Sequence, residues 1–68
     1  MNELVFVIKD AAEGGYTARA LGQSIVTEAD DIEALHRNVR EAVHSHFEDA
    51  AAPKVVRLRF VREGVIAG

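Results

Sequence analysis

The sequence of 68 residues contains no cysteine, no tryptophan and a single proline. The absence of cysteine excludes disulfide bonds and every zinc site that uses a thiolate ligand. A chain of this length forms one domain and buries only about 60% of the surface that its unfolded form exposes. Because disulfides are excluded, we expect this single domain, residues 1–68, to gain stability by association as a homodimer or a higher homo-oligomer.

Long apolar runs and strong positive charge are also missing, and aromatic residues are few. No apolar run approaches the ~20 residues that a helix needs to cross a bilayer. The start, Met1-Asn2-Glu3, lacks the basic segment of a secretory signal peptide, so we expect a cytoplasmic protein. The formal charge of −3 does not suit a generally basic nucleic-acid binder. One tyrosine and three phenylalanines offer few rings for stacking on RNA bases.

Three short strands are predicted in the first part of the chain, over residues 3–9, 15–21 and 23–28. The first is apolar on both faces, since residues 4–8 read LVFVI, and this is typical of a strand in the middle of a sheet. Gly14-Gly15 follows it and tolerates the positive φ of a tight turn. Short turns between all three strands predict an antiparallel meander.

A helix and a final strand complete the predicted domain. The helix covers residues 31–48, with Asp30 as its N-cap and Glu33 closing a capping box. A strand over residues 54–62 returns across the helix, and a right-handed crossover places it parallel to the first strand. The fold class is therefore α+β, a β-β-β-α-β domain with a mixed four-stranded sheet of order 3-2-1-4 and the helix on one face. The predicted core comprises Phe6, Ile32, Leu35, Val39, Val43, Leu58 and Phe60.

Several segments resemble the HicB-like family, whose members share a partial ribonuclease-H-like fold. They are Glu13-Gly14-Gly15-Tyr16, Thr27-Glu28-Ala29-Asp30, Asn38, and Arg40-Glu41-Ala42-Val43. Short solitary members of the family offer further similar stretches: Ala20-Leu21-Gly22, Ser24-Ile25, His46-Phe47, and Pro53 before Arg57-Leu58. The resemblance covers nearly the whole chain. It implies a HicB antitoxin N-terminal domain, with a small HicA-like toxin protein as a partner.

Two departures from the HicB pattern bear on function. Typical HicB antitoxins carry a Pro-x-Leu-Pro-Gly-Cys-like segment between the second and third strands, where this chain has Ala20-Leu21-Gly22-Gln23-Ser24. They also continue into a helix-turn-helix or ribbon-helix-helix domain, whereas this sequence ends at Gly68. We therefore expect a relative of the short, orphan kind, without operator binding.

Catalysis is not expected from this chain. Ribonuclease-H nucleases need carboxylates from several strands and a helix to converge on a divalent metal. Here Glu41 and Glu48 of the predicted helix have no acidic partners in the interior of the first and last strands. We expect no enzyme activity and no cofactor.

Metal binding is not expected either. The acidic run of Glu28, Asp30, Asp31 and Glu33 suits a helix N-terminus, where carboxylates cap free N–H groups and favour the macrodipole. The histidines at 36, 44 and 46 lack the i, i+4 spacing of a helical zinc site. His46 follows the helical stripe toward Phe47, and we expect it to be a partly buried packing residue.

The sheet face away from the helix is the predicted interaction surface. The arginines of the second and last strands flank the valines of the first strand there, and an apolar centre with cationic sides is typical of a contact surface. The predicted partner or dimer interface comprises Val5, Val7, Arg19, Arg57, Arg59 and Val61. We expect its arginines to meet acids of a second copy, Glu3 or Glu63.

Two other interpretations of this face remain open. One is a plain solvated surface, in which arginine stems cover the valines. The other is contact with RNA. The sequence therefore favours a non-catalytic protein-interaction module, with a small nucleic-acid-contacting protein as the alternative.

Overall fold

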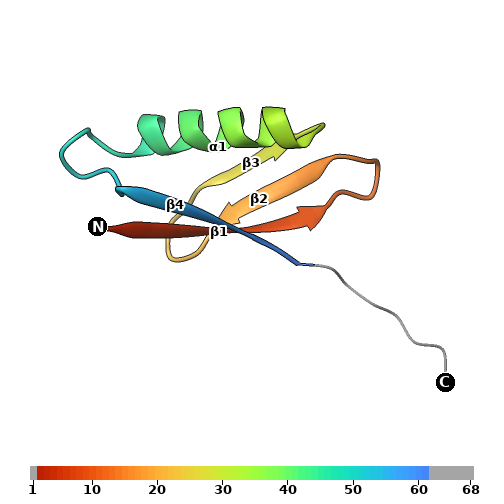
Figure 1. The fold of residues 1–68 in the computed structure, drawn as a ribbon, viewed down its shortest axis with the longest axis horizontal. Coiled ribbons are helices and arrows are strands. Elements are labelled where there is room, and N and C mark those ends of the chain that lie inside the picture. The colour runs from red at the N-terminus through yellow and green to blue at the C-terminus, as the bar shows by residue number, and fades with distance from the viewer. Residues whose placement is uncertain (1, 62–68) are drawn as a thin grey trace, which may run out of the picture.

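The computed structural model describes residues 2–61, in which four strands form one mixed sheet and one helix lies on it (Figure 1). The elements are β1 (Glu3–Asp10), β2 (Tyr16–Ala20), β3 (Val26–Ala29), α1 (Ile32–His46) and β4 (Val55–Phe60). The sheet order is β3-β2-β1-β4. β1 pairs antiparallel with β2 and parallel with β4, which confirms the predicted fold class and the predicted parallel pairing of the first and last strands.

Strand β1 lies inside the sheet, as its two apolar faces predict. Leu4, Phe6 and Ile8 are buried beneath the helix, whereas Val5 and Val7 are half-buried on the opposite face. The period of two in a strand fixes this division, because successive side chains point to opposite faces. Residues that pair across neighbouring strands point to the same face, so this division of β1 also fixes the faces of β2 and β4.

The turn between β1 and β2 relies on two glycines with positive φ, as predicted. Gly14 has φ 99° and Gly15 has φ 80°. The backbone N–H of Ala11 donates to the carbonyl of Gly15 at 3.0 Å and closes the turn. Gly15 also lies against the end of β3, where an added Cβ would come within 2.5 Å of the Ala29 carbonyl oxygen. The position therefore needs glycine for space as well as for conformation.

Helix α1 begins one residue later than the predicted cap implies. Asp31 is the N-cap, and its carboxylate accepts a 2.7 Å hydrogen bond from the backbone N–H of Ala34. The prediction of Asp30 was therefore wrong. The third helical residue after the true cap is Ala34, so Glu33 cannot close a capping box with it. The helix ends at His46, and the Phe47 N–H donates to the Val43 carbonyl at 3.0 Å.

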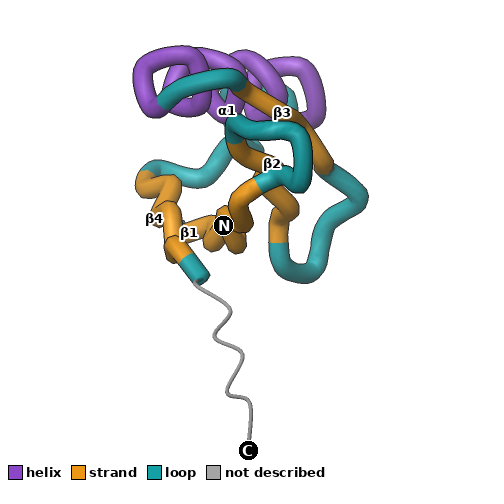
Figure 2. The backbone as a smooth tube through the Cα atoms, turned by 90° about the vertical axis from the view of Figure 1, so that its right-hand side faces the viewer, coloured by secondary structure: helices purple, strands orange, loops and turns teal. Residues whose placement is uncertain are grey.

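The helix packs on β3 and β2 and leaves the β4 side of the same face open (Figures 1 and 2). Its buried residues are Leu35, Val39 and Val43. Beneath them, β2 contributes two small buried residues, Ala18 and Ala20. Within residues 2–61 the buried hydrophobic residues are Leu4, Phe6, Ile8, Ala18, Ala20, Ile25, Leu35, Val39 and Val43.

Two residues predicted for the core are exposed. Ile32 is 41% exposed, because it is the first residue of the helix, immediately after the cap. Phe60 is 53% exposed, because it ends the edge strand beyond the cover of α1 and meets Tyr16 edge-on at a ring-centroid distance of 6.1 Å. Leu58 is half-buried at the margin of the core. Only the correction for Phe60 follows from the lateral position of the helix.

Helix α1 has 15 residues. Within residues 2–61 no helix has the length and apolar character required to cross a bilayer.

The first prediction compares a core position with an exposed one. Leu35 is fully buried, so Leu35→Ala should lower the free energy of unfolding by about 2–5 kcal/mol. Phe60→Ala removes a larger side chain that is half in solvent, and we expect a clearly smaller loss. Urea titration followed by circular dichroism measures both values. Equal losses would show that the helix covers β4 as fully as β2.

The second prediction compares two glycine positions, one that needs glycine for space and for its positive φ, and one that needs it for φ alone. Gly15 and Gly22 have nearly equal φ, 80° and 78°, but an added Cβ at Gly22 meets no atom within 4 Å. Gly15→Ala should therefore destabilise the protein more than Gly22→Ala, by roughly 1–3 kcal/mol, since only position 15 forces a backbone shift. Thermal unfolding of the two variants gives the comparison. A smaller loss for Gly15→Ala would contradict the close approach to β3.

Candidate functional site

The six residues predicted for the interface share the sheet face opposite α1, which we call the open face. Val7 pairs with Arg19 on β2 and with Arg59 on β4, while Val5 pairs with Arg57. Val61 follows β4 and donates its backbone N–H to the Ile8 carbonyl at 2.9 Å, so it continues the same alternation. The structure thus brings all six together on one surface, and their role in an interface remains a prediction.

Apolar residues outside the predicted interface enlarge the open face. Val26 of β3 pairs with Arg19 and is 66% exposed. Leu21 donates its N–H to the Val5 carbonyl at 2.9 Å, which places it beside β1, and it is also exposed. Val55 on β4 is exposed as well, on the side that the alternation of its strand predicts. The sequence signal for Val26 was weak, because β3 has only four residues and its register depends on the loop before it.

The electrostatic centre of the open face is an ion pair within the chain. The Arg57 Nε donates to Glu3 Oε1 at 2.7 Å. This hydrogen bond and then the Coulomb attraction of Arg57 hold the pKa of the Glu3 carboxyl below its ordinary value of 4.5, and the same pair raises the pKa of Arg57. The contact expected between Glu3 and a second copy is thus made inside one chain. Glu63 lies outside the described residues.

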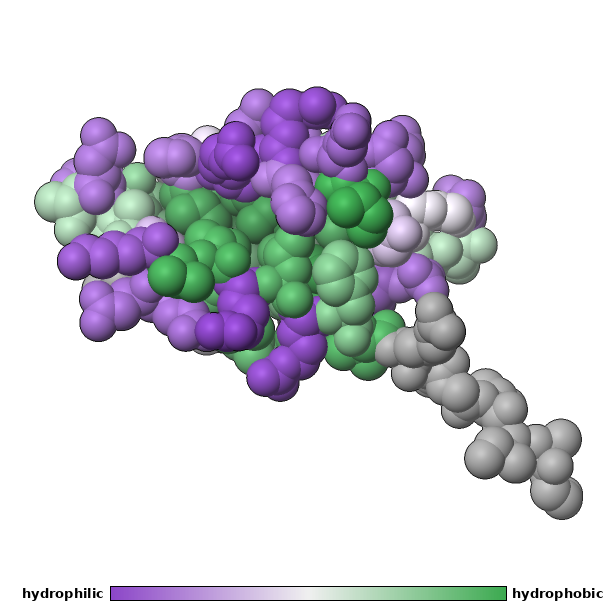
Figure 3. Space-filling model, in the orientation of Figure 1, coloured by the Kyte–Doolittle hydropathy of each residue, from purple (hydrophilic) through white to green (hydrophobic). Residues whose placement is uncertain are grey.

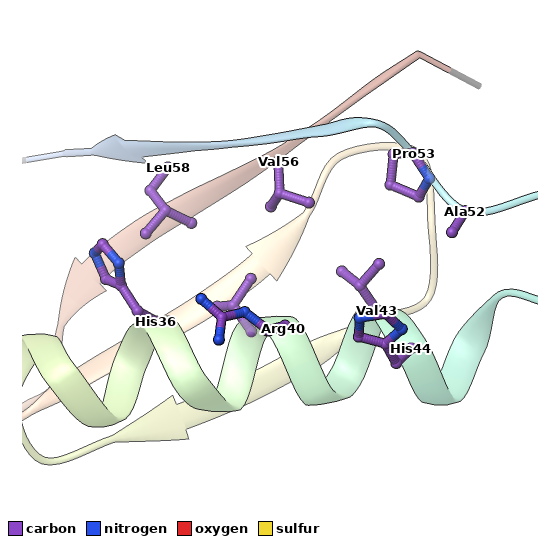
Figure 4. A pocket seen from close by; sticks show the side chains of 9 residues that line it. His36, Arg40, Val43, His44, Ala52, Pro53, Val56 and Leu58 are labelled. Atoms are coloured by element: carbon purple, nitrogen blue, oxygen red, sulfur yellow. The ribbon is translucent and has the colours of Figure 1, made fainter. Parts of the chain in front are cut away.

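A second candidate surface lies between α1 and β4, on the helix side of the sheet, and it is hollow. It is a cavity of about 240 Å³, lined by His36, Val39, Arg40, Val43, His44, Ala52, Pro53, Val56 and Leu58. We call it the α1–β4 groove. Figure 3 shows apolar side chains gathered in the middle of this side of the molecule, below the polar surface of the helix. In Figure 4 the labelled side chains of α1 rise toward those of β4 across the groove.

The acidic residues and histidines considered in the sequence lie in and around helix α1. Asp31 caps the helix, as the expectation for acids at this N-terminus requires. Within residues 2–61 no three histidine, aspartate or glutamate side chains come together as a metal site. His46 is exposed, which corrects its expected burial. Its ring lies edge-on to Phe47 at 4.8 Å, and its Nε2 is 3.3 Å from the Gln23 Oε1.

Two relatives with known names align with most of this chain. A UPF0150 protein of Thermotoga maritima is 40% identical over 65 residues, which cover 96% of this chain and 91% of the relative. A UPF0150 protein of Archaeoglobus fulgidus is 44% identical over 52 residues, covering 76% of this chain and 77% of the relative. This chain belongs to the UPF0150 family. No family model matches the chain, and no solved structure matches it significantly. The family is therefore established, and the HicB-like assignment stays a proposal.

The third prediction concerns the pH dependence of the ion pair. Glu3 is stabilised in its charged form, so the pair supports the fold above the ordinary pKa of 4.5 and ceases to do so as the pH falls through the lowered pKa of the folded state. Arg57→Gln should therefore raise the pKa of Glu3 toward 4.5. An NMR titration of the Glu3 side-chain carboxyl carbon measures this, with Arg59→Gln as the control. An equal rise in the control would show that general positive charge, rather than the hydrogen bond, lowers the pKa.

Proposed function

We propose that the chain is a non-catalytic protein-interaction module whose open face binds a second copy of the chain. One row of side chains across the sheet carries the proposal. From β3 to β4 it consists of Val26, Arg19, Val7 and Arg59. Apolar and cationic side chains thus alternate over all four strands on a face that no element within residues 2–61 covers.

The energetic reason for association is the exposed apolar surface. Val26, Leu21 and Val55 are each at least half exposed on this side of the sheet. Burial of apolar surface contributes about 25 cal/mol per Å², from which the cost of lost translational and rotational freedom must be subtracted. For a small domain with a single helix this contribution is a larger share of the total stability, because its own core is limited.

The charges of the open face favour a second copy as the occupant. Glu28 lies on β3 at one edge of the face, and Arg59 lies on β4 at the other edge, in neighbouring rows. A two-fold axis parallel to the strands places β3 of one copy over β4 of the other, as in aligned packing of two sheets. Each Glu28 then approaches the Arg59 of the other copy. Glu3 is already paired with Arg57 and leaves Arg59 for this contact.

A finer proposal is that the module acts as a HicB-type antitoxin, or as an orphan descendant whose partner is a small HicA-like toxin. The residues that resemble the HicB-like family support it, and so does the α+β fold of order β3-β2-β1-β4. The neighbouring genes test this proposal. A small adjacent reading frame with a double-stranded-RNA-binding pattern supports it, and the consistent absence of such a frame beside genes of this family contradicts it.

The fourth prediction is that the protein self-associates at micromolar concentration through the open face. Sedimentation equilibrium should give about twice the chain mass of 7.4 kDa. Val7→Glu places a carboxylate in the apolar centre and should give a monomer. Ser45→Glu adds the same charge to an exposed position of α1 and should leave the dimer intact.

A charge exchange sharpens this test. Glu28→Arg and Arg59→Glu should each weaken the dimer by placing like charges together, and the double variant should restore it. A parent protein of 7.4 kDa would refute the dimer. A dimer that survives Val7→Glu would refute the open face as its interface. Binding of RNA that is lost in Arg19→Glu would favour the nucleic-acid alternative instead.

A further inference from the structure

We propose that the α1–β4 groove is a second binding site, which accepts an acidic amphipathic helix of a different protein. The floor of the groove is apolar. Val56 and Leu58 of β4 form one side. Val39 and Val43 of α1 line the other side, where they are only 3% and 5% exposed because they also pack in the core. Ala52 and Pro53, which precede β4, also line the cavity.

The β4 edge of the sheet leaves space beside α1. Helix α1 packs on β3 and β2, and Leu4, Phe6 and Ile8 of β1 are buried beneath it. Val56 and Phe60 of β4 are exposed on the same face, so the helix side of β4 lies open next to α1 (Figure 2). A second helix beside α1 would cover this strand, because a helix is about 10 Å wide and neighbouring strands lie about 4.8 Å apart.

The basic side chains of the groove indicate the kind of helix, with Arg40 as the charged group and two histidines that can donate hydrogen bonds. His36, Arg40 and His44 follow one another at four-residue spacing, so they form one stripe along the groove side of α1 (Figure 4). We call this stripe the basic rim. Within residues 2–61 none of the three makes a side-chain hydrogen bond or an ion pair, and no acid lines the cavity. A neighbouring helix with Glu or Asp at the same spacing would meet the rim, and leucines beside these acids would reach the floor.

A second copy of the chain fits this groove poorly. Within residues 2–61 its only helix is α1, whose apolar stripe of Leu35, Val39 and Val43 is buried in its own core. Its edge strand β4 carries Arg57 and Arg59, which would approach their own symmetry mates in an antiparallel β4–β4 pair. Like charges that face each other across strands are destabilising. The occupant is therefore a different protein, and the site is separate from the open face.

A model peptide tests the proposal directly. The probe is a synthetic helix of about 20 residues with leucines at i, i+3, i+4 and i+7 and glutamates flanking them, a length at which a peptide helix is stable enough to use. Its control has the same composition with the leucines scattered. Titration into isotope-labelled protein should shift the NMR signals of Val39, Val43, Val56 and Leu58. The scattered peptide should leave them unchanged.

Charge variants decide whether the basic rim is responsible. Arg40→Glu should weaken binding of the acidic peptide by about tenfold, because the variant replaces an attraction between opposite charges with a repulsion between like charges. It should strengthen binding of a peptide in which lysines replace the glutamates. Arg37→Glu adds the same charge to an exposed position of α1 outside the groove and should change neither affinity. An unchanged amide spectrum of the free variants shows that both retain the fold.

Three results would overturn the proposal. One is the absence of shifts at the floor residues with millimolar acidic peptide, or shifts confined to the open face. Another is an equal reduction of affinity in Arg37→Glu and Arg40→Glu. The third is dissociation of the parent oligomer by Val56→Glu, because the groove would then belong to a second copy. Val7→Glu tests the open face alone, so failure of either site is recognised separately.

Discussion

The packing of one helical stripe onto half of a four-stranded sheet determines most of what is distinctive in this domain. Leu35, Val39 and Val43 pack into the core with the small residues Ala18 and Ala20 of β2. Two polar contacts hold the helix over this half of the sheet. Asp31 caps its first turn, and Asn38 Nδ2 donates to the Glu28 carbonyl of β3 at 2.8 Å. Because α1 is fixed near β3, residues 2–61 leave the β4 edge of its own sheet face and the whole opposite face without a covering element.

The fold could be predicted because its strands have clear alternation and the topology has few alternatives. The two apolar faces of β1 require an inner position, and a right-handed crossover then leaves only one place for β4. Smaller details were beyond the sequence. Asp30 and Asp31 are equally good caps by residue type, so only the backbone decides between them. Helical spacing correctly assigned Leu35, but it included Ile32, which lies at the start of the helix and is 41% exposed.

The two candidate surfaces also differ in how far the sequence predicts them. The open face followed from parity alone, since once β1 and β4 are parallel neighbours, Val7 and Arg59 must share a face. The α1–β4 groove could not be predicted in this way. It depends on how far the helix is displaced sideways across the sheet, and residue spacing in the sequence does not indicate that displacement. Leu58 and Phe60 of β4 were assigned to the core for that reason. Only the structure shows that Phe60 is 53% exposed and that Leu58 lines the α1–β4 groove.

The parallel pairing of β1 with β4 also has a consequence for the order of folding. Strands β1, β2 and β3 and the helix follow one another closely in the chain, so their contacts form with small loop-closure entropy. Glu3 pairs with Val55, however, and this pairing joins the two ends of the described chain. Non-local pairings slow folding, so we expect β4 to join last. Until it does, β1 is an unpaired edge strand with two apolar faces, and during synthesis the growing chain carries this hazard until residues 55–60 have emerged.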